Sequence, residues 1–294
     1  MFGLYNIRKP AGPTSHDIVA RVRRQLPRGT KVGHAGTLDP FADGVLVLCV
    51  GAATRLASYV QAQPKRYLTE ITFGATSTTD DVEGELTPAG NWMAMTQADV
   101  ALALERFVGD IEQVPPAHSA VHVDGQRAYT LARRGRQVHL PPRRVRIHAI
   151  ELLHFEPPRL EIALQCSTGT YIRALARDLG EALQVGGYCS RLTRSAIGEF
   201  TIERAIEPEA LDLDDDLLPA RLAVAHLPHV HVKPDAVARL AQGKFLDPAQ
   251  DTLNASAFEA AEDIALLDEA GKLLALACMR EGALRPTRVF APPE

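Results

Sequence analysis

The residues most able to do chemistry lie in one turn-rich stretch, GHAGTLDPFADG, from Gly33 to Gly44. Three glycines and a proline among its twelve residues predict a stiff loop with unusual backbone angles, the kind of loop that fixes one side chain at a cleft. Asp39 lies near the middle of that loop, directly before Pro40. A carboxylate held there could act as a nucleophile or a base, or it could simply accept hydrogen bonds from the amides of its own turn. The residue types alone leave both interpretations open.

Other chemistries can be weighed on the same loop. Its glycine spacing fits neither of the two common phosphate-binding patterns, G-x-x-x-x-G-K-[ST] and G-x-G-x-x-G. A zinc nucleobase deaminase needs a P-C-x-x-C motif, which the four scattered cysteines do not form. A glycosidase needs a second carboxylate facing the same bond, and Asp43 is the candidate. We therefore expect neither a metal nor a cofactor.

A second chemically suggestive feature is a basic segment. Seven arginines and no acidic residue lie between Gly125 and Ile150, with Arg133 and Arg134 near the middle. Guanidinium groups pair with phosphates through two parallel hydrogen bonds, and the ring of Tyr129 could stack on an unpaired base. The segment indicates contact with RNA, although a solvated surface hairpin would have the same composition.

Composition is that of an ordinary globular protein, with 46% hydrophobic and 23% charged residues among 294. The net charge of −4 argues against nucleic-acid binding, but it hides an asymmetry. Residues 1–150 carry 18 Lys and Arg against 13 Asp and Glu, a balance of +5, whereas the remainder carries 14 against 23, a balance of −9. Scattered cysteines favour reduced thiols, no signal-peptide pattern precedes Arg8, and the longest apolar run, Val45–Val50, is too short for a membrane span. We expect a cytoplasmic protein with no membrane segment.

Hydrophobic periodicity predicts the elements that must position these residues. Thr14 or Ser15 can cap a helix over roughly 15–26, and two more helices are expected to begin after Thr96 and Gly169. Strands are expected at 45–50, 66–73, 144–155, 159–166 and 188–202. Helices and strands alternate without the strict period of parallel βαβ units. The predicted class is therefore α+β, with a mostly antiparallel mixed sheet flanked by helices.

A shift in composition predicts a domain boundary. Residues 203–216 hold seven acids and one base, and Pro219 and Pro228 follow them. We expect a catalytic domain at 1–228 and a small β-rich domain at 229–294. Within the second domain, Ile264–Leu267 and Leu273–Ala277 have the pattern of a β-hairpin.

The motifs of the chain, taken together, resemble those of the TruB-type tRNA pseudouridine synthases. The resemblance covers roughly residues 5–200 and begins with Lys9-Pro-x-Gly-x-Thr-Ser15 and the Asp39 loop. Further motifs follow in the order of the family: Lys65-Arg-Tyr67, Thr76-x-Thr78-x-Asp80, Pro115-Pro116, Ala132-Arg133, Gly169-Thr-Tyr-Ile-Arg173 and Leu192-x-Arg194.

The resemblance implies that the chain isomerises uridine to pseudouridine in the T arm of tRNA, at position 55, without a cofactor. Asp39 would be the catalytic carboxylate, Arg173 would pair with it, and Tyr67 would stack on the base and help to move its C5 proton. For substrate binding the resemblance implies His34, which fills the gap left by the flipped-out uridine. The rest of the implied substrate-binding set is Leu192 (against the base), Tyr171, Lys9, Arg133, Arg134 and Tyr129.

The resemblance further implies an RNA clamp at 120–147, a PUA-like RNA-binding domain at 229–294, and a monomer whose partner is tRNA. A non-catalytic tRNA-binding or tRNA-folding chaperone remains an alternative, because the same clamp and flipping residues would serve it. Guide-RNA-dependent relatives share the motifs but usually carry longer basic extensions, which favours the stand-alone enzyme.

Overall fold

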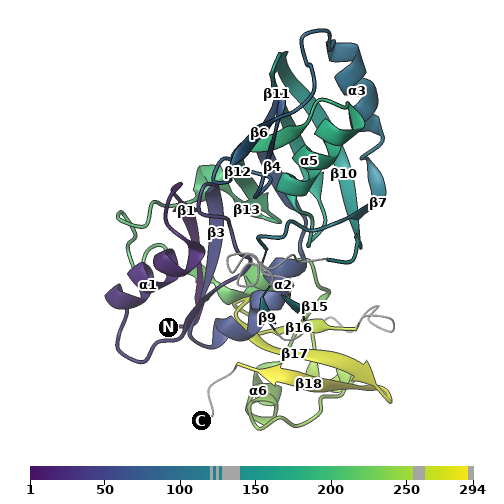
Figure 1. Cartoon of the computed structure of the whole chain (residues 1–294). Helices are drawn as coiled ribbons and strands as arrows, with labels where there is room; N and C mark the ends of the chain where they lie inside the picture. Colours follow the sequence, from purple (N-terminus) through teal and green to yellow (C-terminus); the bar gives the residue numbers. More distant parts are fainter. Residues whose placement is uncertain (120–121, 124–125, 128–139, 254–261, 291–294) are drawn as a thin grey trace.

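The computed structural model describes residues 1–119, 122–123, 126–127, 140–253 and 262–290, and its largest feature is a ten-stranded sheet (Figure 1). The strand order is β14-β1-β3-β12-β4-β11-β10-β7, with β2 paired to β3 and β13 paired to β12. Their bounds are β1 (Gly3–Lys9), β2 (Val32–His34), β3 (Asp43–Val50), β4 (Lys65–Phe73), β7 (Gly109–Gln113), β10 (Arg143–Glu156), β11 (Arg159–Cys166), β12 (Gly187–Ile197), β13 (Phe200–Thr201) and β14 (Leu218–Pro219). The described pairs in this sheet are antiparallel except β12 with β3, which confirms the predicted α+β class.

Burial along the strands follows their place in the sheet. β3 lies between β1 and β12 and is buried from its second residue to its last, as its run of apolar side chains requires. β4 alternates buried and more exposed residues, so Tyr67 shares the buried face with Ile71 and Phe73. The single strand expected at 188–202 is instead a hairpin: Gly198, at φ 51°, turns the chain back so that β13 pairs with the end of β12.

Helices cover the sheet where their apolar stripes predict. α1 (Ser15–Gln25) begins with a capping box formed by Thr14 and Asp17, and it packs on β1 and β3. α5 (Ile172–Ala182) and α3 (Gln97–Glu105) lie together against the β10 and β11 end of the sheet (Figure 1). The shorter elements are α2 (Ala57–Ala62), the 3₁₀ helices at Gly51–Leu56, Ile202–Arg204 and Ala220–Val224, and strands β5 (Ala75–Ser77), β6 (Leu86–Pro88), β8 (His122–Val123) and β9 (Gln126–Arg127).

The C-terminal residues form a second sheet with the order β15 (His229–His231), β16 (Ile264–Leu267), β17 (Leu273–Arg280) and β18 (Ala283–Val289). The predicted hairpin is confirmed by the antiparallel pairing of β16 with β17. Two short helices, α6 (Pro234–Ala241) and α7 (Pro248–Asp251), complete this part. Leu267 and Leu276 pack into one apolar cluster with Leu56 of the first part, so the two parts share buried surface. None of the helices in the described ranges is both long and apolar enough to cross a membrane.

Candidate active site

Asp39 projects from the loop between β2 and β3, whose backbone is bound by residues near the start of the chain. The hydroxyl of Ser15, in the first turn of α1, accepts a hydrogen bond from the amide of Leu38 (2.9 Å) and donates one to the Leu38 carbonyl (3.0 Å). The amide of Gly12 donates to the carbonyl of Pro40 (2.7 Å). The peptide units on both sides of Asp39 are thus held, while its side chain remains 33% exposed.

Two buried cations bind further carbonyl oxygens of this loop. The ammonium of Lys9, which has no exposed surface, donates to the carbonyls of Pro10 (2.8 Å), Pro40 (3.2 Å) and Ala42 (2.8 Å). The guanidinium of Arg194, 2% exposed, donates to the carbonyls of Gly36 (3.1 Å), Thr37 (3.1 Å) and Val45 (2.8 Å). Burial lowers the pKa of Lys9 to about 8. Lys9, predicted to bind substrate, therefore lies inside the protein and holds the loop that carries Asp39.

Gly44 makes the close approach of Arg194 possible. Its φ is +107°, and a Cβ atom at this position would lie 2.3 Å from the carbonyl oxygen of Arg194. Both the backbone conformation and the contact require glycine at the end of the loop.

Arg173, in the first turn of α5, binds two carboxylates at once. Its Nε lies 2.9 Å from Asp39 Oδ2 and its Nη2 donates to Asp39 Oδ1 (3.3 Å), while Nη1 donates to Asp81 Oδ2 (3.1 Å). Nη1 and Nη2 also donate to the carbonyls of Thr79 (2.9 Å) and His118 (2.9 Å). The guanidinium is almost fully buried, and it holds the Asp39 carboxylate through one hydrogen bond, from Nη2, and the close ion pair of Nε, which lacks hydrogen-bond geometry.

Opposing effects act on the protonation of Asp39. Burial is the largest of them and raises the pKa of Asp39, and the nearby charge of Asp81 raises it further. The positive charge of Arg173 opposes this rise and favours the ionised form. The result is an anion that is more basic than a solvated aspartate and is still paired with a cation.

Asp81 was not singled out from the sequence, although it follows the last residue of the Thr76-x-Thr78-x-Asp80 motif. It is 2% exposed, and its Oδ1 accepts from the amide of Glu83 (2.9 Å). Its neighbour Asp80 pairs with Arg177 of α5, with 2.9 Å between Oδ2 and Nη1. Two ion pairs, Asp80–Arg177 and Asp81–Arg173, therefore attach the segment that carries these aspartates to α5. In the sequence, only the neighbouring motif could have drawn attention to Asp81.

Tyr67 and Leu192 lie on the adjacent strands β4 and β12. Both belong to one buried cluster with Leu38 and Ala42 of the loop that carries Asp39. They are 8% and 5% exposed. Burial raises the pKa of Tyr67, so its phenol keeps its proton at neutral pH. The structure thus brings an aromatic ring and an apolar side chain to the base of the loop that carries Asp39.

His34, the last residue of β2, lies just before that loop. Its ring meets the ring of His16 of α1 edge-on, with 5.1 Å between centroids. Its buried Nδ1 has no hydrogen-bond partner among the residues that the structure describes. Burial and the nearby His16 lower the pKa of His34 to about 4, so the imidazole is neutral at physiological pH.

Of the other predicted binding residues, the structure describes only Tyr171. Its backbone is clamped by the Gln113 side chain, which accepts from the Tyr171 amide (2.8 Å) and donates to the Tyr171 carbonyl (3.1 Å). This clamp sets the position of the turn that begins α5 and carries Arg173. Arg133, Arg134 and Tyr129 fall outside the described residues.

Within the described ranges, no group of three or more His, Cys, Asp and Glu side chains is arranged to hold a metal ion. The carboxylate that shares a guanidinium with Asp39 is Asp81, and no described contact links Asp43 to Arg173. The geometry is that of a half-buried carboxylate on a held loop, oriented by one arginine beside buried aromatic and apolar side chains.

Residues 23–172 match the profile of the TruB family pseudouridylate synthase N-terminal domain. This match covers half of the chain and includes Asp39 and Tyr67. The chain belongs to this family. Its relatives include a protein named tRNA pseudouridine synthase B from Symbiobacterium thermophilum, 49% identical over 245 residues that cover 82% of each chain. Another of the same name, from Thiobacillus denitrificans, is 40% identical over 98% of this chain and 96% of its own length.

Solved structures extend the similarity to the whole fold. A chain from a structure described as an H/ACA RNP bound to a substrate RNA containing 2′-deoxyuridine superposes with a TM-score of 0.75 at 25% identity, over 100% of this chain and 86% of that one. A chain of a Cbf5-Nop10-Gar1 complex gives the same TM-score, 0.75, at 26% identity, over 99% and 86%. The similarity to these solved structures therefore extends over the C-terminal sheet as well as the large sheet.

Proposed function

We propose that this TruB-family chain isomerises uridine to pseudouridine in the T arm of tRNA, at position 55, with Asp39 as the catalytic carboxylate. The observation that carries the proposal is the Asp39–Arg173 contact at 2.9 Å, on a loop in which side chains bind five backbone carbonyls. The names of the relatives, tRNA pseudouridine synthase B, support the choice of tRNA.

The reaction detaches uracil by breaking its bond from N1 to C1′ and reattaches the same ring through C5. The C5 proton leaves, N1 gains a proton, and no other atom enters or departs, so one carboxylate suffices without a cofactor. Asp39 would act either as a nucleophile or as a base at the sugar. Its burial favours a basic anion and Arg173 favours its ionisation, and both properties suit either role.

The substrate nucleotide must leave its stacked position in the folded RNA to reach this carboxylate. The uncharged His34 imidazole, with an unsatisfied Nδ1, suits a group that enters the vacated position. Tyr67 would stack on the flipped base and, as a neutral phenol, assist the transfer of the C5 proton, while Leu192 would pack against the base.

The remaining parts of the proposal concern RNA binding. Residues 1–228 would form the catalytic domain, with Arg133, Arg134 and Tyr129 in a clamp at 120–147 and Tyr171 facing the substrate. Residues 229–294 would form a PUA-like RNA-binding module. We expect a monomer that works in the cytoplasm, where it meets tRNA, and light scattering would test the oligomeric state.

Release of tritium from tRNA labelled at uridine C5 tests the function. The purified protein alone should release the label, and Asp39→Asn should abolish release while its affinity for tRNA stays within a few-fold. Asp43→Asn, a neutralised aspartate on the same loop, is the matched control and should stay active. An active Asp39→Asn variant would exclude Asp39 as the catalytic group. If the unchanged protein released no label but refolded tRNA, the chaperone alternative would replace the enzyme.

A further inference from the structure

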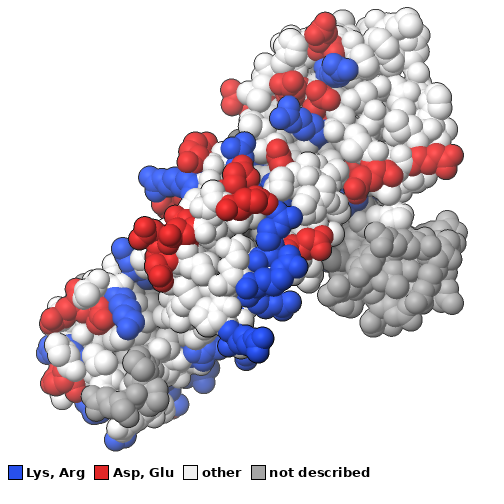
Figure 2. All heavy atoms as spheres, turned by 90° about the vertical axis from the view of Figure 1, so that its left-hand side faces the viewer, with Lys and Arg blue, Asp and Glu red and all other residues white. Residues whose placement is uncertain are grey.

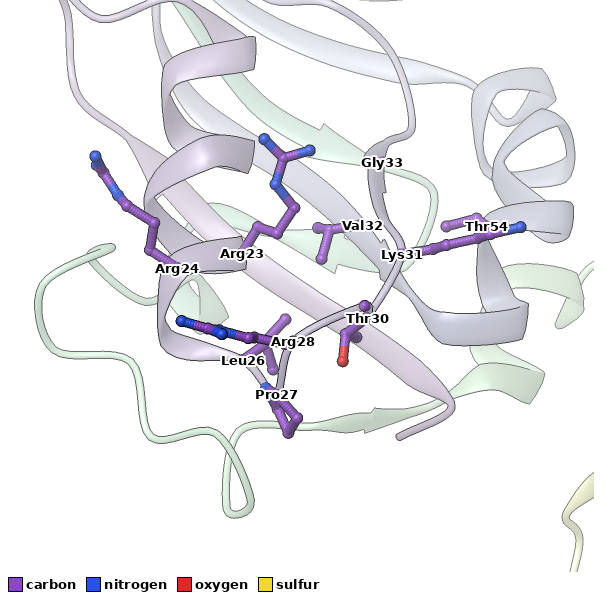
Figure 3. A pocket seen from close by; sticks show the side chains of 11 residues that line it. Arg23, Arg24, Leu26, Pro27, Arg28, Thr30, Lys31, Val32, Gly33 and Thr54 are labelled. Atoms are coloured by element: carbon purple, nitrogen blue, oxygen red, sulfur yellow. The ribbon is translucent and has the colours of Figure 1, made fainter.

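An open basic hollow of about 660 Å³ lies where α1 ends and the chain enters β2 (Figure 3). Four cationic side chains line it: Arg23, Arg24, Arg28 and Lys31. All four are exposed, and no acidic residue contributes to the lining. A ligand of this hollow must therefore be anionic and approachable from solvent.

The cations of the hollow differ from others nearby in having no acidic partner. Arg8 and Arg21 pair with Glu207 and Glu209. The four cations of the hollow form no ion pair with any residue in the described part of the chain. In Figure 2, which shows the side of the molecule where α1 lies in Figure 1, Lys and Arg side chains gather in one band near the middle. This uncompensated charge stands out in a chain of net charge −4.

A purely structural role accounts for only part of the set. Arg23 and Arg24 occupy the last turn of α1, where cations stabilise the helix dipole. Arg28 and Lys31 lie beyond the helix, on a turn closed by a hydrogen bond from the Thr30 amide to the Pro27 carbonyl (3.1 Å). At Gly29 of that turn a Cβ atom would meet nothing within 4 Å, so the turn faces open space.

The hollow is next to the nucleotide-flipping residue of the proposed site. Gly33 lines the hollow and His34 follows it, so Lys31 lies roughly 10 Å along an extended strand from His34. On α1, Arg23 is seven residues from His16 and therefore on the same helix face, and the ring of His16 touches that of His34. A polyanion bound at His34 and extended along β2 and α1 would reach these cations.

We propose that this hollow binds phosphates of the RNA stem that flanks the flipped nucleotide, a contact separate from the clamp at 120–147. The inference rests on the proposed function, because the stem is that of the RNA arm that Asp39 modifies. Several cations on an open surface suit the successive phosphodiesters of a strand, since each neutralised phosphate releases counterions and strengthens binding.

The test compares two double variants in an Asp39→Asn background, which separates RNA binding from catalysis. Arg28→Ala with Lys31→Ala removes two unpaired cations, whereas Arg8→Ala with Arg21→Ala removes two that are already paired with glutamates. We expect the first pair to lower the slope of log affinity against log salt by about 1.5 to 2 units and to weaken binding of a T-arm hairpin by roughly 30-fold at 0.1 M salt. The control pair should change the slope by less than about half a unit.

A second RNA, the same loop on a stem cut to its closing pairs, identifies the phosphates. The loss of RNA affinity in the Arg28/Lys31 variant should largely vanish with this shorter RNA, because the phosphates that the hollow binds are missing from it. A loss of affinity equal to that of the control pair would overturn the inference. In the catalytically competent protein, KM should rise with kcat unchanged. If the unchanged protein released tritium normally but the Arg28/Lys31 variant showed no change in salt slope, the RNA-binding role of the hollow alone would be rejected. If the unchanged protein released no tritium, the proposed function would be rejected.

Discussion

The hydroxyl of Ser15 offers a direct test of how hydrogen bonds hold the loop that carries Asp39 in place. It is 1% exposed and bridges the amide and the carbonyl of Leu38, the residue before Asp39. Ser15→Ala removes one oxygen and leaves a buried N–H and a buried C=O without partners. At about 1–2 kcal/mol for each lost contact, the free energy of unfolding should fall by roughly 2–4 kcal/mol. With about 2 °C per kcal/mol for a chain of this size, Tm should fall by roughly 4–8 °C.

The effect on catalysis should exceed the effect of stability alone. A released Leu38 peptide lets Asp39 drift from its place beside Arg173, and a displacement of about 1 Å can cost on the order of 100-fold in rate. We expect kcat for tritium release to fall at least about 10-fold at 25 °C, where the variant is still folded, with KM unchanged.

Ser190→Ala is the control, because the Ser190 hydroxyl likewise contacts a single residue of a neighbouring strand and shares its one proton between the carbonyl (3.1 Å) and the carboxylate (2.7 Å) of Glu70. It should lower Tm without lowering kcat. If the two variants lost stability alike and both kept their full kcat, the Ser15 bridge would contribute to stability and not to the placement of Asp39.

Three further outcomes follow from the site. Burial raises the pKa of Asp39, so single-turnover rates should fall as pH drops through a value above the ordinary 3.8. Asp81→Asn should move this fall to lower pH, because the charge of Asp81 adds to the rise of the pKa. A pH profile unaffected by Asp81→Asn would contradict the coupling of the two carboxylates. Gly44→Ala should lower the free energy of unfolding by more than about 3 kcal/mol in denaturant titrations and abolish activity, since its Cβ would lie 2.3 Å from the Arg194 carbonyl oxygen. Gly12→Ala, at a similar φ of +104° but in open space, should lower it by only about 1–2 kcal/mol. Equal losses of stability would refute the steric argument. The pKa of His34 is lowered from 6.5 to about 4, so the unfolded chain binds this proton first, and the free energy of unfolding should decline as pH falls across that window. His34→Gln should flatten this decline when stability is measured by urea titration at several pH values. An unchanged decline would show that the imidazole does not stay neutral in the fold.

Local patterns in the sequence predicted the elements that depend on local interactions. The capping box at Thr14 and the apolar spacing after it begin α1 where expected, because both parts of the signal lie within one helix. The strand expected at 66–73 is present as β4, and its residues alternate between buried and more exposed positions. The one expected strand that became a hairpin, β12 with β13, turns at Gly198, where a glycine inside a strand pattern permitted a reversal that apolar periodicity does not detect.

The contacts that make the site could not be predicted in the same way. Motifs resembling a known family brought Asp39, Tyr67 and Arg173 together as expected partners, but no spacing in the chain indicates that Arg194 binds Gly36, 158 residues away, or that Asp81 shares Arg173 with Asp39. Lys9 is the clearest case: the resemblance implied that it binds substrate, and the fold buries it against the loop carbonyls.

Hydrophobic period, capping and turn chemistry act over a few residues, so the sequence predicted the α+β class and elements such as α1, β4 and the hairpin of β16 with β17. Asp39 was proposed only through motifs that resemble a family. The tertiary structure decided which groups surround that carboxylate, and with them its orientation and its basicity. The physical reason is that hydrogen bonding, Coulomb attraction and desolvation depend on distance in space, and the sheet order that sets those distances joins strands such as β3 and β12, whose paired residues are about 150 positions apart.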